Sequence, residues 1–588
     1  MESLAAVFRT RVLAGAPRVL LLVLLAALPL ATAPSARPHP QQAGTSQHGV
    51  YLVFPFENRG ASQHLDWLGE GLAELAIQRL SAAGESVYSH SGRMNELDRY
   101  GLPASAKLSR ATMLRIAEDL DADYVVLGSF ASDGTSLSVE ARVLRVAATR
   151  LLAPIRETGP LDSLMDVVNK LAWRTVSTNG RSYPLSLAEF SKKQRAVRLD
   201  AFEHYIRGLI AADDDAKLRN LREAARLEPD WPDPDFALGE VYFARRDCSG
   251  ALPWYARVPK NHDRSVEALF STGVCQLLSK QPDKAEETFI AIQQNLHKDG
   301  LAGADLPEIL NNLALARAQA GKFPDAQIDL RKATEMDPDE DDYPFNQGLL
   351  ALRANDAADA ATHFREASGR EPDNPEDRAF LILALEKAGK KSEADEERVS
   401  SEEAFGPKGL PAIRWDAKDP VAAAKFDRIK MELDTTQLQL ELKPPETAAA
   451  SASGGAGANS DSPANWIRSG RQSLASGQVS EADRAFRAAL AGDPGNSAAH
   501  RGLAEVNRRQ GKLDDAVKEL QASLQSRDSA VVRTTLARVY LEQKKPDLAR
   551  AELQKALKLA PNYTEAKQLL ERLQKSKSAE SKPSGGTR

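Results

Sequence analysis

Large, small and helix-breaking residues recur at fixed offsets along most of the chain. In the stretch from Trp466 to Pro494, with Gly470 taken as position 8 of a unit, Ala482 falls at position 20 and Phe486 at position 24. Small residues at positions 8 and 20 let two antiparallel helices approach closely, large residues at positions 4 and 24 fill the remaining space, and a proline ends the second helix. One such hairpin cannot bury its apolar face alone, so neighbouring copies are expected.

The same marks return in further units on both sides of a region rich in alanine, serine and glycine. They are carried by Ala504 and Leu520, Ala549 and Pro561, Gly239 and Tyr255, Gly273 and Phe289, Ala314 and Pro338, and Gly348 and Pro372. A shortened unit around Gly208 begins the upstream set and a degenerate unit around Gly389 ends it. The pattern resembles the tetratricopeptide repeat, whose period is about 34 residues. The resemblance implies two α-α superhelical arrays, over 199–400 and 465–575, the second closed by a capping helix after Pro561.

The pattern changes between residues 48 and 155. An apolar strand from Gly49, an amphipathic helix from Trp67, a weak strand, a second helix and two strands around Asp133-Gly134 follow one another. This dipeptide favours the dihedrals of a tight hairpin, so the order predicts a small α/β domain. The VFPFEN start, the WLGEGLAELAIQRL helix and the DYVVLGSF strand resemble the TolB amino-terminal-like domain, which implies assembly or sensing rather than a reaction. Residues 156–198 are expected to form connecting helices.

The first residues have the features of a targeting segment. Arginines precede the apolar run Val19–Ala31 and small residues follow it, which is the pattern of a secretory signal peptide over 1–33, with a linker at 34–47. The run is shorter than the ~20 apolar residues that a membrane span requires. We therefore expect an exported, periplasmic protein without a span after signal cleavage; an uncleaved membrane anchor is the alternative.

Three further segments lie outside the predicted domains. Residues 401–443 stay unassigned, because the stretch Asp419–Leu442 within them looks helical at first and then alternates like a strand. The low-complexity composition of 444–464 is typical of a disordered linker. Residues 576–588 are expected to form a disordered tail. The predicted fold class is thus mainly α: two tetratricopeptide-repeat arrays preceded by a small α/β domain.

Composition and motifs narrow the function. With 77 basic and 82 acidic residues the net charge is only -5, which predicts neither nucleic-acid binding nor an anionic membrane partner. No zinc-protease, nucleophile-elbow or phosphate-loop motif is present, and His64 and His90 have no neighbouring ligand at metal spacing. Glu70 and Glu74 lie one helical turn apart and are interpreted as a solvated face. We predict no catalytic residues, no metal and no cofactor.

Two classes of function remain. We favour a non-enzymatic scaffold of the bacterial cell envelope that binds other proteins or peptides in repeat grooves. The alternative is a sensor whose α/β domain binds a small molecule, for which the loop Glu57–Ser62 is the candidate. An enzyme would need a site assembled from unrelated positions.

The family resemblance places positions 2, 5, 9, 12 and 13 of each first helix on the concave face. In the first array these positions include the aromatics Phe202, Tyr205, Phe236, Phe243, Phe270 and Phe345, with Leu352 and the acids Asp233, Glu240, Glu267 and Asp342. Such a groove suits an extended or helical segment with apolar anchors and positive charge. The alternative is that several of these aromatics pack between the helices of the array. In the second array the same repeat positions hold Arg471, Arg501, Arg508, Arg509 and Arg538. These arginines suit acidic partners, or they pair with Glu505, Glu542 and Asp483 as surface salt bridges.

The two cysteines are expected at one end of neighbouring hairpins. Cys248 begins the second helix of its unit and Cys275 lies late in the first helix of the next unit. An oxidising compartment would permit a disulfide between them, whereas isolated cysteines are often just small buried residues.

Overall fold

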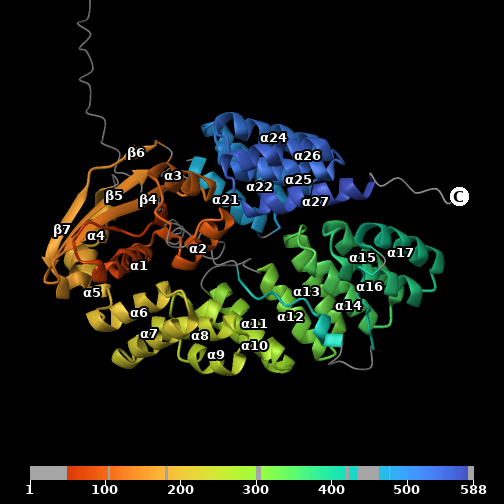
Figure 1. Ribbon diagram of the computed structural model, residues 1–588, viewed down its shortest axis with the longest axis horizontal. Coiled ribbons are helices and arrows are strands. Elements are labelled where there is room, and N and C mark those ends of the chain that lie inside the picture. The colour runs from red at the N-terminus through yellow and green to blue at the C-terminus, as the bar shows by residue number, and fades with distance from the viewer. Residues whose placement is uncertain are drawn as a thin grey trace, which may run out of the picture. The chain divides into compact units, whose positions relative to one another are not determined.

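The computed structural model describes residues 49–103, 106–146, 148–178, 183–298, 306–406, 408–416, 423–433, 463–475 and 477–580. Within these ranges the fold is mainly helical, with a small α/β domain followed by helical arrays, which confirms the predicted fold class (Figure 1). None of the helices in the described ranges is long and apolar enough to cross a membrane. The predicted signal peptide 1–33 and linker 34–47 lie outside the described residues.

The α/β domain is built on one mixed sheet. Its strands are β1 (Val50–Val53), β2 (Glu57–Asn58), β3 (Ser86–Val87), β4 (Tyr124–Ser132), β5 (Ser136–Arg145), β6 (Arg150–Leu151) and β7 (Ile155–Pro160). β1 runs parallel to both β3 and β4, and β4 turns back antiparallel into β5. The turn follows the predicted hairpin, with Gly134 at a φ of 92°. β7 then pairs antiparallel with β5, so 156–198 begins with a strand and not, as expected, with a helix.

Helices cover both faces of this sheet. They are α1 (Trp67–Ala82), α2 (His90–Arg99), α3 (Arg110–Asp119), α4 (Leu164–Thr178) and α5 (Leu187–Lys193), with the short turns η1 (Gln63–Leu65) and η2 (Leu161–Ser163). Successive strand residues point to opposite faces. Tyr51 and Val53 accordingly share a core with α1 and α4, whereas Val50 and Leu52 share one with α2 and α3.

The first array consists of six helical hairpins within the described part of 199–405. Their helices are α6 (Leu199–Ile210), α7 (Asp214–Leu227), α8 (Pro232–Ala244), α9 (Cys248–Tyr255), α10 (Ser265–Leu278), α11 (Pro282–Lys298), α12 (Pro307–Gln319), α13 (Phe323–Met336), α14 (Asp342–Arg353), α15 (Ala357–Arg370), α16 (Pro375–Lys387) and α17 (Lys391–Phe405). The small residues at position 8 are needed for close packing. A Cβ added at Gly348 would lie 2.6 Å from the Phe364 ring, inside van der Waals contact.

The second array has the same construction. Its helices are α21 (Pro463–Ala475), α22 (Val479–Gly492), α23 (Ser497–Arg509), α24 (Leu513–Ser526), α25 (Ala530–Glu542), α26 (Pro546–Leu559) and the single α27 (Thr564–Glu580). At Gly470 an added Cβ would lie 2.7 Å from Phe486. Two boundaries differ from the expected ones: α21 begins inside the predicted linker 444–464, and α27 continues into the predicted tail 576–588.

The unassigned segment 401–443 acquires a structure where it is described. Residues 401–405 belong to α17, and residues 417–422, where the helical pattern begins, lie outside the described residues. The 3-10 turn η3 (Ala424–Phe426) follows, and residues 427–433 are extended without belonging to a strand. In Figure 1 this stretch is the teal trace that runs across α12 and α14. Its contacts, described next, explain its extended conformation.

Candidate peptide-binding groove of the first array

Three asparagines on the first helices of two successive repeats hold the backbone of the extended segment. Asn346 on α14 accepts a hydrogen bond from the Arg428 amide at 3.0 Å and donates its own amide to the Arg428 carbonyl at 3.0 Å. Asn312 on α12 makes the same pair of bonds with Lys430, at 2.9 and 2.8 Å. Asn311 donates to the Arg428 carbonyl at 3.0 Å. The three asparagines therefore bind backbone groups of Arg428 and Lys430, and these bonds do not depend on which side chains the two residues carry.

The spacing of these amides follows the repeat. Asn312 and Asn346 occupy the same position in consecutive units, two residues before Ala314 and Gly348 respectively. An extended chain repeats every two residues, and the two asparagines hold residues 430 and 428. One repeat of the array thus corresponds to one dipeptide of the bound segment.

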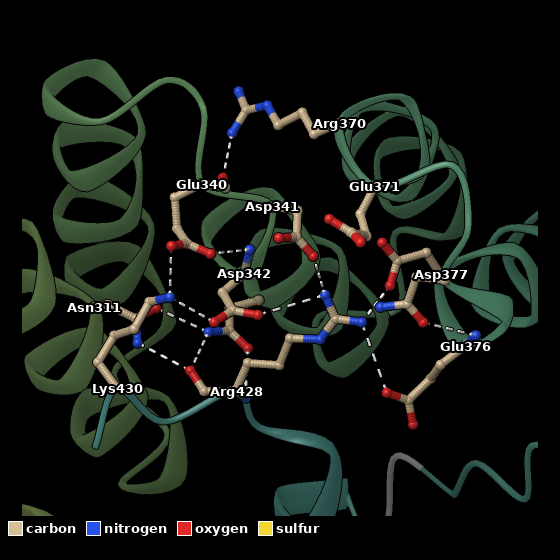
Figure 2. A network of polar contacts seen from close by, with 12 residues as sticks. Asn311, Glu340, Asp341, Asp342, Arg370, Glu371, Glu376, Asp377, Arg428 and Lys430 are labelled. Carbon is tan, nitrogen blue, oxygen red and sulfur yellow. Dashed lines mark hydrogen bonds and ion pairs between the residues drawn. The ribbon is translucent and has the colours of Figure 1, made fainter. Parts of the chain in front are cut away.

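The side chains of the held residues enter a pocket of acidic groups. Arg428 pairs with Asp341 at 2.8 Å and with Asp377 (Figure 2). Its guanidinium lies 3.5 Å from the centre of the Phe345 ring. Lys430 pairs with Asp342 at 2.6 Å and Glu340 at 2.9 Å. The oxygens of Glu340, Asp341 and Asp342 lie close enough together to hold a cation. The side chains of Arg428 and Lys430 face these three carboxylates.

Burial makes these charges interdependent. The side chain of Arg428 is 12% exposed and that of Asp377 is fully buried. Burial raises the pKa of Asp377 to about 7, against the opposing effect of the Arg428 charge. Burial alone would lower the pKa of Lys430, but the Asp342 and Glu340 carboxylates outweigh it and raise that pKa. The acidic pocket is therefore matched to two cationic side chains spaced two residues apart.

Apolar side chains of the segment pack on either side of these pairs. Ile429, Met431 and Leu433 pack against the core cluster that contains Phe236 and Phe270. Upstream, the Phe426 ring lies 4.9 Å from that of Phe380. Beside the segment remains an open hollow of ≈ 690 Å³, to which Leu278, Asp342, Glu376 and Met431 contribute.

The predicted groove of exposed aromatics needs correction. Phe202, Tyr205, Phe236, Phe243, Phe270 and Phe345 are all buried, none more than 9% exposed. Phe202 and Tyr205 do not line the groove at all, because they pack against Trp231, and Phe202 also contacts Trp67 of the α/β domain. Of the six, Phe345 alone has its ring beneath a cation of the segment.

The sequence analysis did not identify the residues that bind the extended segment. Asn311, Asn312 and Asn346 carry the backbone contacts, and Asp341 and Asp377 bind Arg428. The available signal was the recurrence of asparagine at the same repeat position in consecutive units. Of the predicted acids, Asp342 does face the segment.

The arginines of the predicted basic groove in the second array pair with acidic residues of the same chain. Arg471 and Arg501 both pair with Asp121, which follows α3. Arg508 pairs with Asp339 at 2.5 Å and with Glu505 and Glu542. Arg509 pairs with Glu505 and Arg538 with Glu565. The expected partner Asp483 instead pairs with Arg487. Arginine–carboxylate pairing thus occurs, with acids of the same chain.

The remaining candidates have structural roles. Cys248 and Cys275 form a disulfide, with Cα atoms 5.2 Å apart, that links α9 to α10. In the loop Glu57–Ser62, Asn58 donates to the Ser62 carbonyl and accepts from the Gly60 amide, so this side chain is engaged within the loop. Glu70 and Glu74 are 8% and 9% exposed, which corrects their interpretation as a solvated face.

Comparison with known families agrees with this architecture. Tetratricopeptide-repeat models match residues 236–295, 311–375, 345–394 and 468–531, and a second such model matches 530–563. The chain contains tetratricopeptide repeats. A model described as FlgO protein matches residues 39–164. The match over the α/β domain is thus to this family, and the resemblance to the TolB amino-terminal-like domain stays a prediction.

Three solved structures illustrate the similarity found among known structures. The MamA protein is 19% identical over 31% of this chain and 98% of its own, with a TM-score of 0.26. PilW, a type IV pilus biogenesis factor, is 18% identical over 35% of this chain and 91% of its own, with a TM-score of 0.29. YrrB, a repeat protein with an unusual peptide-binding site, is 12% identical over 31% of this chain and 90% of its own, with a TM-score of 0.26. Among curated proteins no sequence match was found.

Proposed function

We propose that this protein is a non-catalytic scaffold of the bacterial cell envelope that binds an extended segment of a partner protein in the groove formed by α12, α14 and α16. The observation that carries the proposal is the set of paired backbone hydrogen bonds from Asn312 and Asn346. Such bonds recognise an extended backbone, and neighbouring pockets supply side-chain selectivity, as in other modes of extended-peptide recognition.

Two features support the envelope location. The pattern of residues 1–33 is that of a secretory signal. The Cys248–Cys275 disulfide is of the kind that persists in oxidising compartments such as the periplasm. In the candidate sensor loop, Asn58 is engaged by hydrogen bonds within the loop itself, and this contact gives the sensor no support.

Photo-crosslinking in intact cells tests the proposal. A photoreactive amino acid is placed at Leu278, which borders the groove and is 39% exposed, and at Ile328 on α13, which is 54% exposed, as the matched control. The expected result is a crosslink from position 278 to one segment of an exported protein, mapped by mass spectrometry, and none from position 328. Equal labelling from both positions, or none from position 278, would contradict a peptide-binding groove.

A further inference from the structure

We propose that residues 424–433 are an internal competitor that closes this groove, and that the partner segment displacing them carries the same chemistry: two cationic side chains two residues apart, with apolar residues between and after them. This inference rests on the proposed function and adds the class of partner and its regulation. A chain of that pattern can make the backbone contacts and the two cationic contacts of the segment. The segment also buries Asp427, which pairs with Arg353 and with Gln319, so an acidic residue directly before the first cation completes the match.

The contacts of the segment are those of a bound peptide rather than of a folded element. Its held amides and carbonyls bond to side chains of α12 and α14, located 82 to 118 residues earlier in the chain. No strand pairing involves the described residues 427–433. The groove, and not the local sequence, therefore imposes the extended conformation.

The acidic pocket sets the charge of the occupant. Asp341, Asp342 and Asp377 surround the Arg428 guanidinium, and Glu340 and Asp342 hold Lys430. Emptying the groove would leave these carboxylates without cations, so an occupant lacking positive charge is disfavoured. A second occupant must bring its own cations to the positions of Arg428 and Lys430.

The competition is intramolecular and consequently strong. A tethered segment has an effective concentration of about 1 mM, so a free peptide that binds with a dissociation constant of about 10 µM would be weakened on the order of 100-fold. The groove then opens only to a partner that binds more tightly or is itself presented at high local concentration. The segment thereby sets a threshold for partner binding.

The test measures binding of a labelled peptide, AAKFDRIKMEL, which copies residues 423–433, to the full chain by fluorescence anisotropy. The competitor is released by the variant Arg428→Glu/Lys430→Glu, which places negative charge against the acidic pocket. The control Lys408→Glu/Arg414→Glu makes the same change of charge at two exposed residues outside the segment. We expect the peptide to bind the released variant on the order of 100-fold more tightly than the wild type, with the control like the wild type. Adding Asn311→Ala/Asn346→Ala to the released variant should remove most of that gain.

Hydrogen exchange on the wild-type chain gives a second readout that needs no variant. The amides of Arg428 and Lys430 should exchange slowly and become faster when excess unlabelled peptide is added. Equal peptide affinity for the wild type and the released variant would overturn the competitor while leaving the peptide groove intact. If the released variant is folded by circular dichroism, exchanges rapidly at residues 428 and 430 and still does not bind the peptide, both this inference and the proposed function fail.

Discussion

At the scale of single residues, Glu70 shows what a buried charge requires of its neighbours. Its carboxylate contacts Arg93, which is 1% exposed, and His90 Nδ1 at 2.8 Å. Arg93 also donates to the Val53 carbonyl at 2.7 Å, which fixes the group against β1. Burial raises the pKa of Glu70, but the Arg93 charge and the His90 contacts outweigh it and lower that pKa to about 2.

Replacing Glu70 with glutamine should cost about 3–5 kcal/mol of unfolding free energy at neutral pH, because Arg93 would stay buried without its counter-charge. Since the folded pKa lies below the usual value of 4.5, the contribution is complete above that pH and is lost as pH falls towards 2. The difference between wild type and Glu70→Gln in urea denaturation should shrink over that window.

A matched control separates burial from charge. Glu57→Gln removes a carboxylate that pairs with Arg59 on the surface, where both side chains are more than half exposed. Its expected cost is below about 1 kcal/mol. A similar loss for both variants would show that the Glu70 contact is no stronger than a surface pair.

At the scale of elements, the helical hairpins could be predicted and the extended segment could not. Residues such as Gly348 and Phe364 lie within one hairpin and meet through local helix packing, so their spacing in the sequence encodes the contact. The conformation of 427–433 depends on Asn312 and Asn346, far away in the chain, and has no local pattern of its own. Of the acids predicted for the groove, Asp342 faces the segment, whereas the aromatics predicted for it are buried in the core.

The disulfide belongs to this scale because it ties two elements. α9 (Cys248–Tyr255) has 8 residues and contains Pro253, whereas the corresponding α13 has 14. A shortened second helix offers less surface to α10, and the Cys248–Cys275 bond joins the two helices covalently.

Reduction of this bond should destabilise the first array. A bond across 27 residues restricts the unfolded chain by about 3 kcal/mol in the loop-entropy estimate. Urea denaturation of the wild type should therefore shift to lower urea when reductant is added. The double variant Cys248→Ala/Cys275→Ala should not respond to reductant; a shift of equal size in that variant would contradict the assignment.

At the scale of the whole molecule, acidic residues of one part satisfy basic residues of another. The arginines of the second array were predicted to bind carboxylates of a partner, and the structure supplies Asp121 of the α/β domain to Arg471 and Arg501. The chemistry was readable from the sequence because arginine and carboxylate groups pair wherever they meet. The identity of the acid was not, because Asp121 lies 350 residues before Arg471.

The variant Asp121→Asn tests whether this pairing holds the second array. Asp121 has a φ of 52°, a left-handed conformation that asparagine also tolerates, so the substitution removes the charge and keeps the backbone. Arg501 would lose its ion pair with Asp121 and keep only the nearby Asp119 charge, which opposes the lowering of its pKa by burial. We expect a loss of about 3 kcal/mol of unfolding free energy in urea denaturation and faster amide exchange in α23.

Asp483→Asn is the control. It breaks a comparable pair with Arg487 within α22, where Arg487 is 60% exposed, and should cost less than about 1 kcal/mol. If the two variants lose equal stability and α23 keeps its exchange rate, the Asp121 pair is an ordinary surface contact and the arginines of the second array remain available to another partner.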